Sequence, residues 1–154
     1  MLKVISPTQN YEIRYDPLGS GKFRAPRGNG RRIHLGADFV CEPGQAIVAP
    51  ISGKVVREAR PYEDPEEPYL GILISDGILS IKMFYLLPAP DLCEKGRMSV
   101  VDQGKGIGIA QDITKRKPEY RGMIPHIHME VRLNSAFSLP KWPEGLLINP
   151  EVLL

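Results

Sequence analysis

The histidines of this chain are the residues whose types and spacing could do chemistry, and there are only three. Two of them, His126 and His128, lie two residues apart in the apolar run PHIHMEVR. A β-strand sends alternate side chains to opposite faces. A strand here would therefore project His126, His128 and Glu130 together, with the apolar residues between them on the other face. Such a face can offer metal ligands to a groove. The alternative is a half-buried strand whose polar face happens to carry histidines.

The third histidine, His34, precedes a carboxylate, Asp38, by four residues. On a helix this spacing would align the two side chains on one face. Gly36 and the β-type residues Phe39 and Val40 instead favour an irregular turn that leads into a strand. An isolated H-x-x-x-D pattern is common by chance and carries little information by itself.

Together, the histidines and Asp38 match the chemistry of a catalytic zinc site, which takes three protein ligands and keeps a fourth position for water. His34, Asp38 and one of His126 and His128 would supply two neutral nitrogens and one anionic oxygen. The remaining histidine would be free to move protons beside the metal. We predict zinc binding on this basis. The alternative is three unrelated histidines at surface or core positions.

The elements that must position these residues are predicted to be short strands. Proline and glycine each occur 15 times in 154 residues, which disfavours long helices. We expect one domain over residues 1–154, with N-terminal strands and a loop in 1–32 and the zinc-site core in 33–154. Regular turn signals indicate an all-β fold with minor helix, either a sandwich or a barrel-like antiparallel sheet. The predicted strands are 2–6, 12–15, 39–40, 46–50, 53–60, 69–75, 78–87, 98–101, 107–110 and 125–132.

Three longer segments are predicted to be loops. Residues 16–32 are rich in glycine, proline and basic residues and show neither a helical nor a strand period. They could form the wall of a binding cleft or a surface excursion. Residues 112–125 are expected to form a polar loop with one helical turn, and residues 133–145 a further loop.

Net charge and composition limit the classes of binding partner that the chain is expected to have. A net charge of +2 gives no case for nucleic acid or an anionic membrane surface, and no window is apolar enough to insert into a membrane. The N-terminus has no signal-peptide core. The localisation therefore stays open between the cytoplasm, another export route and release from a longer precursor. Cys41 and Cys93 could pair or remain reduced.

Several blocks of the sequence resemble the lysostaphin-type zinc metallopeptidases. HLGADF at 34–39, followed by PGQAIVAPISGKVV at 43–56, is similar to that family's H-x-x-x-D motif and its P-G-x-x-V-x-A-x-x-x-G-x-V strand pair. Residues 105–110 resemble its Gly-rich strand, and 125–132 resemble its "PHLHFEVR" block. The resemblance covers about residues 11–154, in the right order. It implies a small β-rich fold with an antiparallel sheet and a groove edged by loops.

The resemblance also implies roles for the residues. The zinc ligands would be His34, Asp38 and His128, and His126 would be the catalytic histidine. The family normally has a second catalytic histidine in a Y-x-H-L segment, and here Tyr85 occupies that place. A tyrosine hydroxyl can donate to an oxyanion but cannot readily act as a base at neutral pH. Alternatively, Tyr85 only packs in the groove after catalysis was lost.

Two hypotheses follow from this departure. The first is a monomeric zinc endopeptidase that cuts peptides of bacterial peptidoglycan, with Tyr85 in place of the family histidine. The second is a zinc-bearing binding module that holds a peptide, glycan or protein partner without cutting it. Residues 16–28 and 81–85 resemble the leukocyte-derived chemotaxin branch, which keeps the zinc site but is regarded as lacking peptidase activity. Most of that branch's disulfide cysteines are missing, which argues against a secreted animal cytokine. A domain of a phage or secretion particle is a third possibility.

Overall fold

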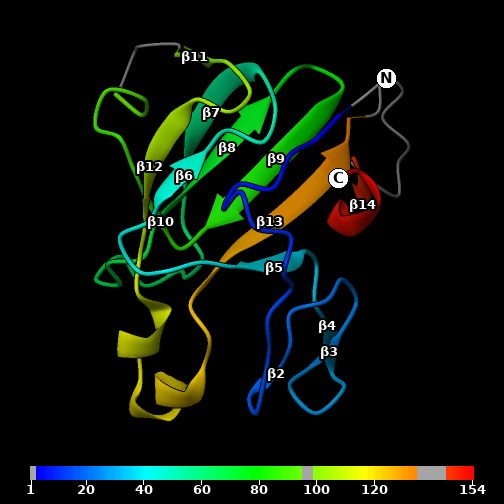
Figure 1. Cartoon of the computed structure of the whole chain (residues 1–154), viewed down its shortest axis with the longest axis vertical. Helices are drawn as coiled ribbons and strands as arrows, with labels where there is room; N and C mark the ends of the chain where they lie inside the picture. The colour runs from blue at the N-terminus through cyan, green and yellow to red at the C-terminus, as the bar shows by residue number, and fades with distance from the viewer. Residues whose placement is uncertain (1–2, 95–98, 135–144) are drawn as a thin grey trace.

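The computed structural model describes residues 3–94, 99–134 and 145–154, which fold into short antiparallel strands (Figure 1). The strands are β1 (Tyr15–Asp16), β2 (Gly19–Ser20), β3 (Pro26–Arg27), β4 (Arg32–Ile33), β5 (Ala37–Val40), β6 (Ala46–Val48), β7 (Gly53–Ala59), β8 (Gly71–Ser75), β9 (Leu79–Phe84), β10 (Leu86–Pro88), β11 (Val100–Val101), β12 (Gly106–Ala110), β13 (His126–Leu133) and β14 (Leu146–Ile148). The helices of the described residues are short 3-10 turns: η1 (Ile113–Lys115), η2 (Pro118–Gly122) and η3 (Pro150–Val152).

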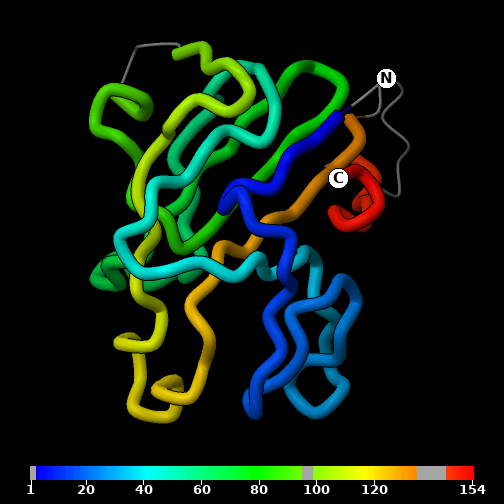
Figure 2. Tube along the Cα trace, in the orientation of Figure 1, coloured from blue at the N-terminus to red at the C-terminus, as the bar shows by residue number. Residues whose placement is uncertain are grey.

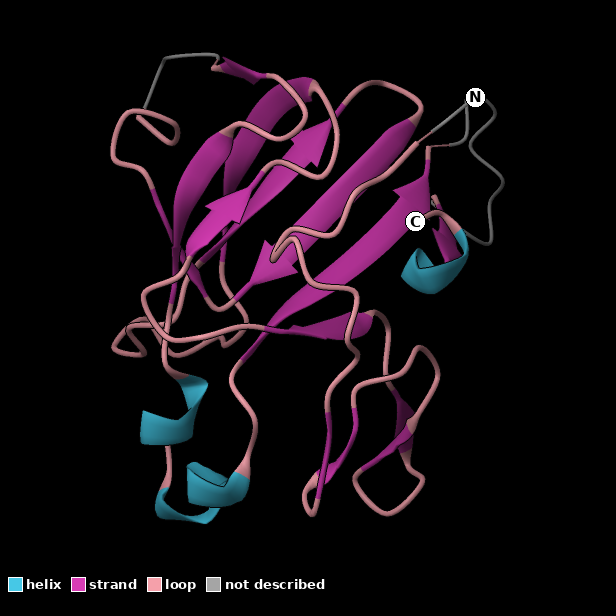
Figure 3. Ribbon diagram, in the orientation of Figure 1, coloured by secondary structure: helices cyan, strands magenta, loops and turns pink. Residues whose placement is uncertain are grey.

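Two sheets enclose the core. The larger has the order β11-β7-β8-β9-β13-β14, with β5 also paired to β13, and the smaller has the order β10-β12-β6. Residues of β9 alternate between buried and partly exposed, as expected for a strand with one core-facing side. Ile47 and Ile107 of the small sheet join Ile74 and Ile81 of the large sheet in one apolar cluster. The all-β prediction is therefore confirmed, and the sheets of the described residues stay open rather than closing into a barrel (Figure 3).

Strand β13 is the element that organises the site. Its first residues pair with β5, which sets Asp38 directly opposite His128. On its other edge β13 pairs with β9, which sets Phe84 opposite His128. Ile127 and Met129 are fully buried, whereas His128 and its alternate neighbours line a groove. The predicted two-faced strand is confirmed.

The segment 16–32 differs from the predicted loop. It forms two hairpins, β1–β2 and β3–β4, which extend from one end of the large sheet (Figure 2). Each strand has only two residues, which is too short to show a period in the sequence. The turn between β3 and β4 uses left-handed backbone, with φ of 55° at Gly28 and 57° at Asn29. The segment is thus better ordered than its composition indicated.

Other local predictions differ in detail. The strand predicted at 2–6 is wrong for the described residues 3–6, because the N–H groups of Val4 and Ile5 bond to Leu153 and Pro50 rather than to a strand. Residues 112–125 contain two helical turns rather than one. Residues 135–144 of the predicted loop 133–145, and residue 98 of the predicted strand 98–101, lie outside the described residues. Across the described residues, no helix combines the length and apolar character needed to span a membrane.

Candidate metal centre

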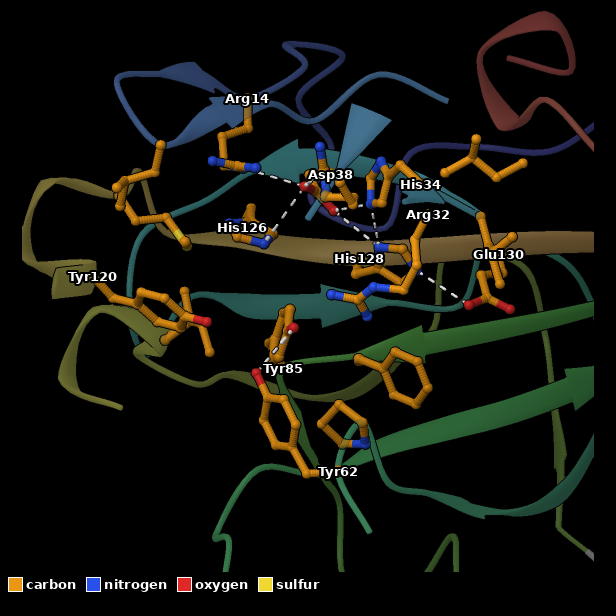
Figure 4. A pocket seen from close by; sticks show the side chains of 18 residues that line it. Arg14, Arg32, His34, Asp38, Tyr62, Tyr85, Tyr120, His126, His128 and Glu130 are labelled. Carbon is orange, nitrogen blue, oxygen red and sulfur yellow. Dashed lines mark hydrogen bonds and ion pairs between the residues drawn. The ribbon is translucent and has the colours of Figure 1, made fainter. Parts of the chain in front are cut away.

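His34, Asp38 and His128 bring three potential ligand atoms into one small triangle. His34 Nε2 lies 2.8 Å from His128 Nδ1 and 3.0 Å from Asp38 Oδ1. The third side, from His128 Nδ1 to Asp38 Oδ1, measures 2.9 Å. All three residues are buried, and their side chains converge from the turn after β4, from β5 and from β13 (Figure 4). The structure therefore brings together the three residues expected to bind metal.

The outer hydrogen bonds of the two histidines leave the correct nitrogens free for a metal. His34 Nδ1 lies 2.9 Å from the carbonyl of Lys22, which can only accept, so Nδ1 donates and Nε2 keeps its lone pair. His128 Nε2 lies 3.3 Å from Glu130 Oε1 and donates to it, so Nδ1, which faces Asp38 Oδ1 at 2.9 Å, is the nitrogen that would bind a metal after losing its proton. Both nitrogens face the same point as Asp38 Oδ1. Metal-ligating histidines usually donate their second N–H in this way.

The donor set fits zinc. Zinc bonds of about 2.0–2.1 Å at tetrahedral angles place ligand atoms about 3.3 Å apart, so the sides of 2.8, 2.9 and 3.0 Å in this triangle would need to lengthen only slightly on binding. Burial alone would lower the pKa of His128, but hydrogen bonds to Asp38 and Glu130 raise it to about 9, so that in the metal-free protein Nδ1 carries a proton, which a bound metal ion would replace. The centre between these atoms therefore favours a cation. Two nitrogens, one carboxylate oxygen and supporting second hydrogen bonds are what a zinc centre with an open position requires.

Two arginines contact Oδ2 of Asp38, the carboxylate oxygen other than the one directed at His34 and His128. Arg14 Nε lies 3.2 Å from Oδ2, and a guanidinium nitrogen of Arg27 lies 3.5 Å from the same oxygen. Burial raises the pKa of Asp38, but attraction to His126 in its protonated form and the hydrogen bonds of His128 and His34 outweigh it and hold that pKa well below its ordinary value. The ligand is consequently an anion whose Oδ1 is directed at the two histidines.

Gly36 is required by close packing at the start of β5. A Cβ at this position would lie 2.3 Å from the carbonyl oxygen of Met129 and 2.9 Å from His128 Cε1. Real Cβ atoms do not approach other atoms so closely, so the H-x-G-x-D turn can reach β13 only with glycine in the middle. This glycine lets His34 and Asp38 meet His128.

His126 lies beside the cluster without joining the triangle. Its Nδ1 donates to the carbonyl of Ile124 at 2.8 Å, so Nε2 carries the lone pair, 3.8 Å from Asp38 Oδ2. Burial lowers the pKa of His126 below its ordinary value, and attraction from Asp38 offsets only part of that effect. The imidazole is therefore neutral near pH 7 and can accept a proton.

Tyr85 lies on the other side of His126, between β9 and β10. Its ring is 5.3 Å from the His126 ring, edge to face, and its hydroxyl is 3.2 Å from the hydroxyl of Tyr62 (Figure 4). Burial, together with Tyr62, raises the pKa of Tyr85 well above its ordinary value. Tyr85 thus remains a hydrogen-bond donor at any physiological pH.

These side chains line one groove of about 780 Å³. Residues of the hairpins β1–β4 line it, together with residues of η1, η2 and the loop around Tyr62. Arg116 stacks over the Tyr62 ring at 3.6 Å and pairs with Glu67 at 2.6 Å, which fixes that loop.

Tyr62 was not predicted as a site residue from the sequence, because a Pro- and Glu-rich loop gives no sign of which side chain turns inward. The segment 16–32, expected to form the wall of a binding cleft or a surface excursion, supplies Arg27 and Arg32 to the groove.

The cysteines are both free among the described residues. Cys41 is buried and Cys93 is partly buried. The alternative of a disulfide between them, left open by the sequence, is not formed in this structure.

Comparison with known proteins identifies relatives that match about three quarters of the chain. No family profile matches the chain. Bovine (Bos taurus) leukocyte cell-derived chemotaxin-2 is 33% identical over 120 residues, which cover 77% of this chain and 72% of that protein. Chicken (Gallus gallus) myeloid protein 1 is 31% identical over 121 residues, which cover 77% of this chain and 34% of that protein.

Solved structures show the same fold at lower identity. The protein cbpa from L. salivarius REN matches with a TM-score of 0.62 and 17% identity, over 99% of this chain and 95% of that one. Csd3 of Helicobacter pylori matches with a TM-score of 0.58 and 20% identity, over 99% and 33%. The antimicrobial peptidase lysostaphin of Staphylococcus simulans matches with a TM-score of 0.54 and 20% identity, over 88% and 50%. The chain thus spans half or less of the last two proteins.

Proposed function

The chain belongs to the family of leukocyte cell-derived chemotaxin-2, on the fold of the lysostaphin-type zinc peptidases, and we propose that it is a zinc-dependent endopeptidase acting on bacterial cell-wall peptides. One observation carries the proposal. His34 Nε2, His128 Nδ1 and the oxygen Oδ1 of Asp38 face one point, and a neutral His126 lies beside them. A zinc-stabilised scaffold without chemistry would not need that fourth residue.

His34, Asp38 and His128 would hold the zinc ion. Zinc bound there supplies Lewis-acid chemistry: it polarises a peptide carbonyl and lowers the pKa of water from 15.7 to about 7. His126, with its lone pair on Nε2, accepts the proton of the attacking water and returns it to the leaving amine. Burial keeps His126 unprotonated for the first of these steps.

Tyr85 acts as a hydrogen-bond donor in this scheme. Its raised pKa excludes it as a base near neutral pH, but its hydroxyl, paired with that of Tyr62, can supply a donor to the oxyanion that develops on the carbonyl. Loss of one oxyanion donor costs on the order of 10²–10³ in rate in other enzymes. Because Tyr85 stands where the lysostaphin-type motif has a histidine, we expect hydrolysis to be slow.

A second candidate function rests on the same tyrosine. The hydroxyl of Tyr85 is already engaged by Tyr62, and the position lacks the imidazole expected from the lysostaphin-type motif. On this alternative the groove holds zinc and a peptide, glycan or protein partner without cleavage.

Two measurements separate the candidates. Metal analysis after zinc-replete expression should find stoichiometric zinc in the wild type and in His126→Ala, because His126 is not one of the three ligands. Clearing of purified cell walls, followed by turbidity, should then be lost in His126→Ala. Equal clearing rates in the two proteins at equal zinc content would rule out the endopeptidase mechanism. Wild type that binds zinc but never clears cell walls would favour the binding module, and a Tyr85→His variant that gains clearing would locate the missing activity at residue 85.

A further inference from the structure

We propose that the groove selects peptides that carry a carboxylate, and that the guanidinium of Arg32 binds this group beside the metal centre. The inference rests on the proposed function, since it names the substrate class of the same groove. Cell-wall cleavage does not by itself require any particular charge on the peptide. The selection comes from the distribution of arginines around the cluster.

Arg32 differs from the other two arginines of the groove. Arg14 pairs with Asp16 at 2.7 Å and with Asp38 at 3.2 Å, and Arg27 also contacts Asp38. The guanidinium of Arg32 forms no ion pair or hydrogen bond with any residue that the structure describes, although it lines the groove. In Figure 4 it reaches, in that view, between His128 and the Tyr62–Tyr85 pair. It is an arginine available to a ligand.

The charges of the groove favour an anion. Three arginines line it, but only two carboxylates, Asp38 and Glu130. Both carboxylates are already occupied: Asp38 by histidines and Arg14, and Glu130 by His128 and, at 2.9 Å, by Lys82 Nζ. Positive charge is therefore in excess before a metal is counted, and zinc adds two charges. Arginine binds carboxylates through two parallel N–H···O bonds, which gives geometric selection as well as attraction.

The surroundings of Arg32 favour a peptide as the bearer of the carboxylate. Ile33, Leu35 and Leu18 line the same groove while remaining 50%, 39% and 45% exposed. Exposed apolar side chains beside a free guanidinium match a peptide whose apolar residues flank an acidic group. A free anion would leave this apolar surface without a partner.

The test measures binding of three acetylated pentapeptides to the zinc-loaded full chain by isothermal titration calorimetry. The first is Ac-AAEAA-NH₂, the second Ac-AAQAA-NH₂, and the third Ac-AAQAA with a free C-terminal carboxylate. We expect one or both acidic peptides to bind roughly tenfold more tightly than the neutral peptide, as charge-assisted hydrogen bonds to one partner usually contribute. The acidic peptide that binds more tightly than the neutral one shows whether a side-chain or a terminal carboxylate is selected.

Matched variants assign this preference to Arg32. Arg32→Gln should remove it and leave the neutral peptide unaffected, and Arg32→Lys should retain only part of it. Arg31→Gln is the control, because Arg31 is also exposed but does not line the groove. A preference that survives Arg32→Gln, equal binding of all three peptides, or no binding of any of them would each overturn the inference. Absence of zinc from the wild type would instead contradict the proposed function, and the same titrations with the metal-free chain would then test the role of Arg32 separately, because its guanidinium lines the groove without the metal.

Discussion

A single methyl group at residue 36 should damage the metal centre without touching a ligand. In Gly36→Ala the new Cβ would lie 2.3 Å from the carbonyl oxygen of Met129 and 2.8 Å from its carbonyl carbon. Both atoms belong to the backbone of β13, so relief requires β5 and β13 to separate by about 1 Å, a strain of the size that costs about 1–3 kcal/mol in packed interiors. At about 2–4 °C per kcal/mol for a chain of this size, the Tm of the zinc-free protein should fall by roughly 2–12 °C.

The same methyl group should weaken zinc binding. It would lie 2.9 Å from His128 Cε1, the ring carbon between the two nitrogens, so the ring must turn away and carry Nδ1 with it. Displacement of an orienting contact around a metal ligand usually costs about 10–100-fold in affinity. Competition with a chromophoric chelator measures this change. Gly106→Ala is the control, because its Cβ would meet nothing within 4 Å, and we expect both Tm and zinc affinity to stay near wild type.

The Tm and the zinc affinity of Gly36→Ala test two separate effects of the methyl group. A fall in Tm with unchanged zinc affinity would show that the strands separate but that His128 keeps its position. If Gly36→Ala retained wild-type Tm and zinc affinity, the close approach of residue 36 to β13 would itself be refuted.

Three other perturbations follow from the contacts of the cluster. Asp38→Asn should abolish tight zinc binding. It should also lower the free energy of unfolding of the zinc-free chain by about 3 kcal/mol in urea, because Arg14 keeps one carboxylate partner and Arg27 keeps none among the described residues. Glu130→Gln should weaken zinc binding about 10–100-fold by chelator competition, since His128 loses its anionic partner; Lys82→Gln should have a smaller effect, and an equal effect would contradict this order. Removal of zinc with a chelator should lower stability by about 2.7 kcal/mol relative to protein at zinc one hundred times its Kd, and an unchanged melting curve would show that no zinc binds.

The parts of the site that could be predicted from the sequence are those encoded over a few residues. The alternation of His126, Ile127 and His128 fixes which side chains face the groove, because strand geometry has a period of two. Chemistry alone limited the ligand set to His34, Asp38 and one more histidine, and the choice between His126 and His128 came from the family resemblance. The assignment of catalytic roles stays a prediction.

The parts that could not be predicted depend on contacts between distant segments. Tyr62 meets Tyr85 across 23 residues, and Arg116 reaches Tyr62 from a third segment. No local spacing encodes such contacts. The hairpins around Arg32 were not predicted for a different reason. Strands of two residues have no period, and their turns depend on left-handed backbone that several residue types can adopt.

The backbone at Tyr85 shows how the fold can keep its site while changing the chemistry there. Residue 85 lies between the end of β9 in the large sheet and the start of β10 in the small sheet, and its φ of 67° turns the chain from one sheet to the other. Its N–H donates to Leu70 and its carbonyl accepts from Gln111, so the turn is held by main-chain bonds that any side chain would leave intact. Histidine adopts left-handed backbone more readily than most residues. The turn therefore directs whatever side chain occupies residue 85 at His126, and exchanging tyrosine for histidine alters the donor in the groove without altering the fold that presents it.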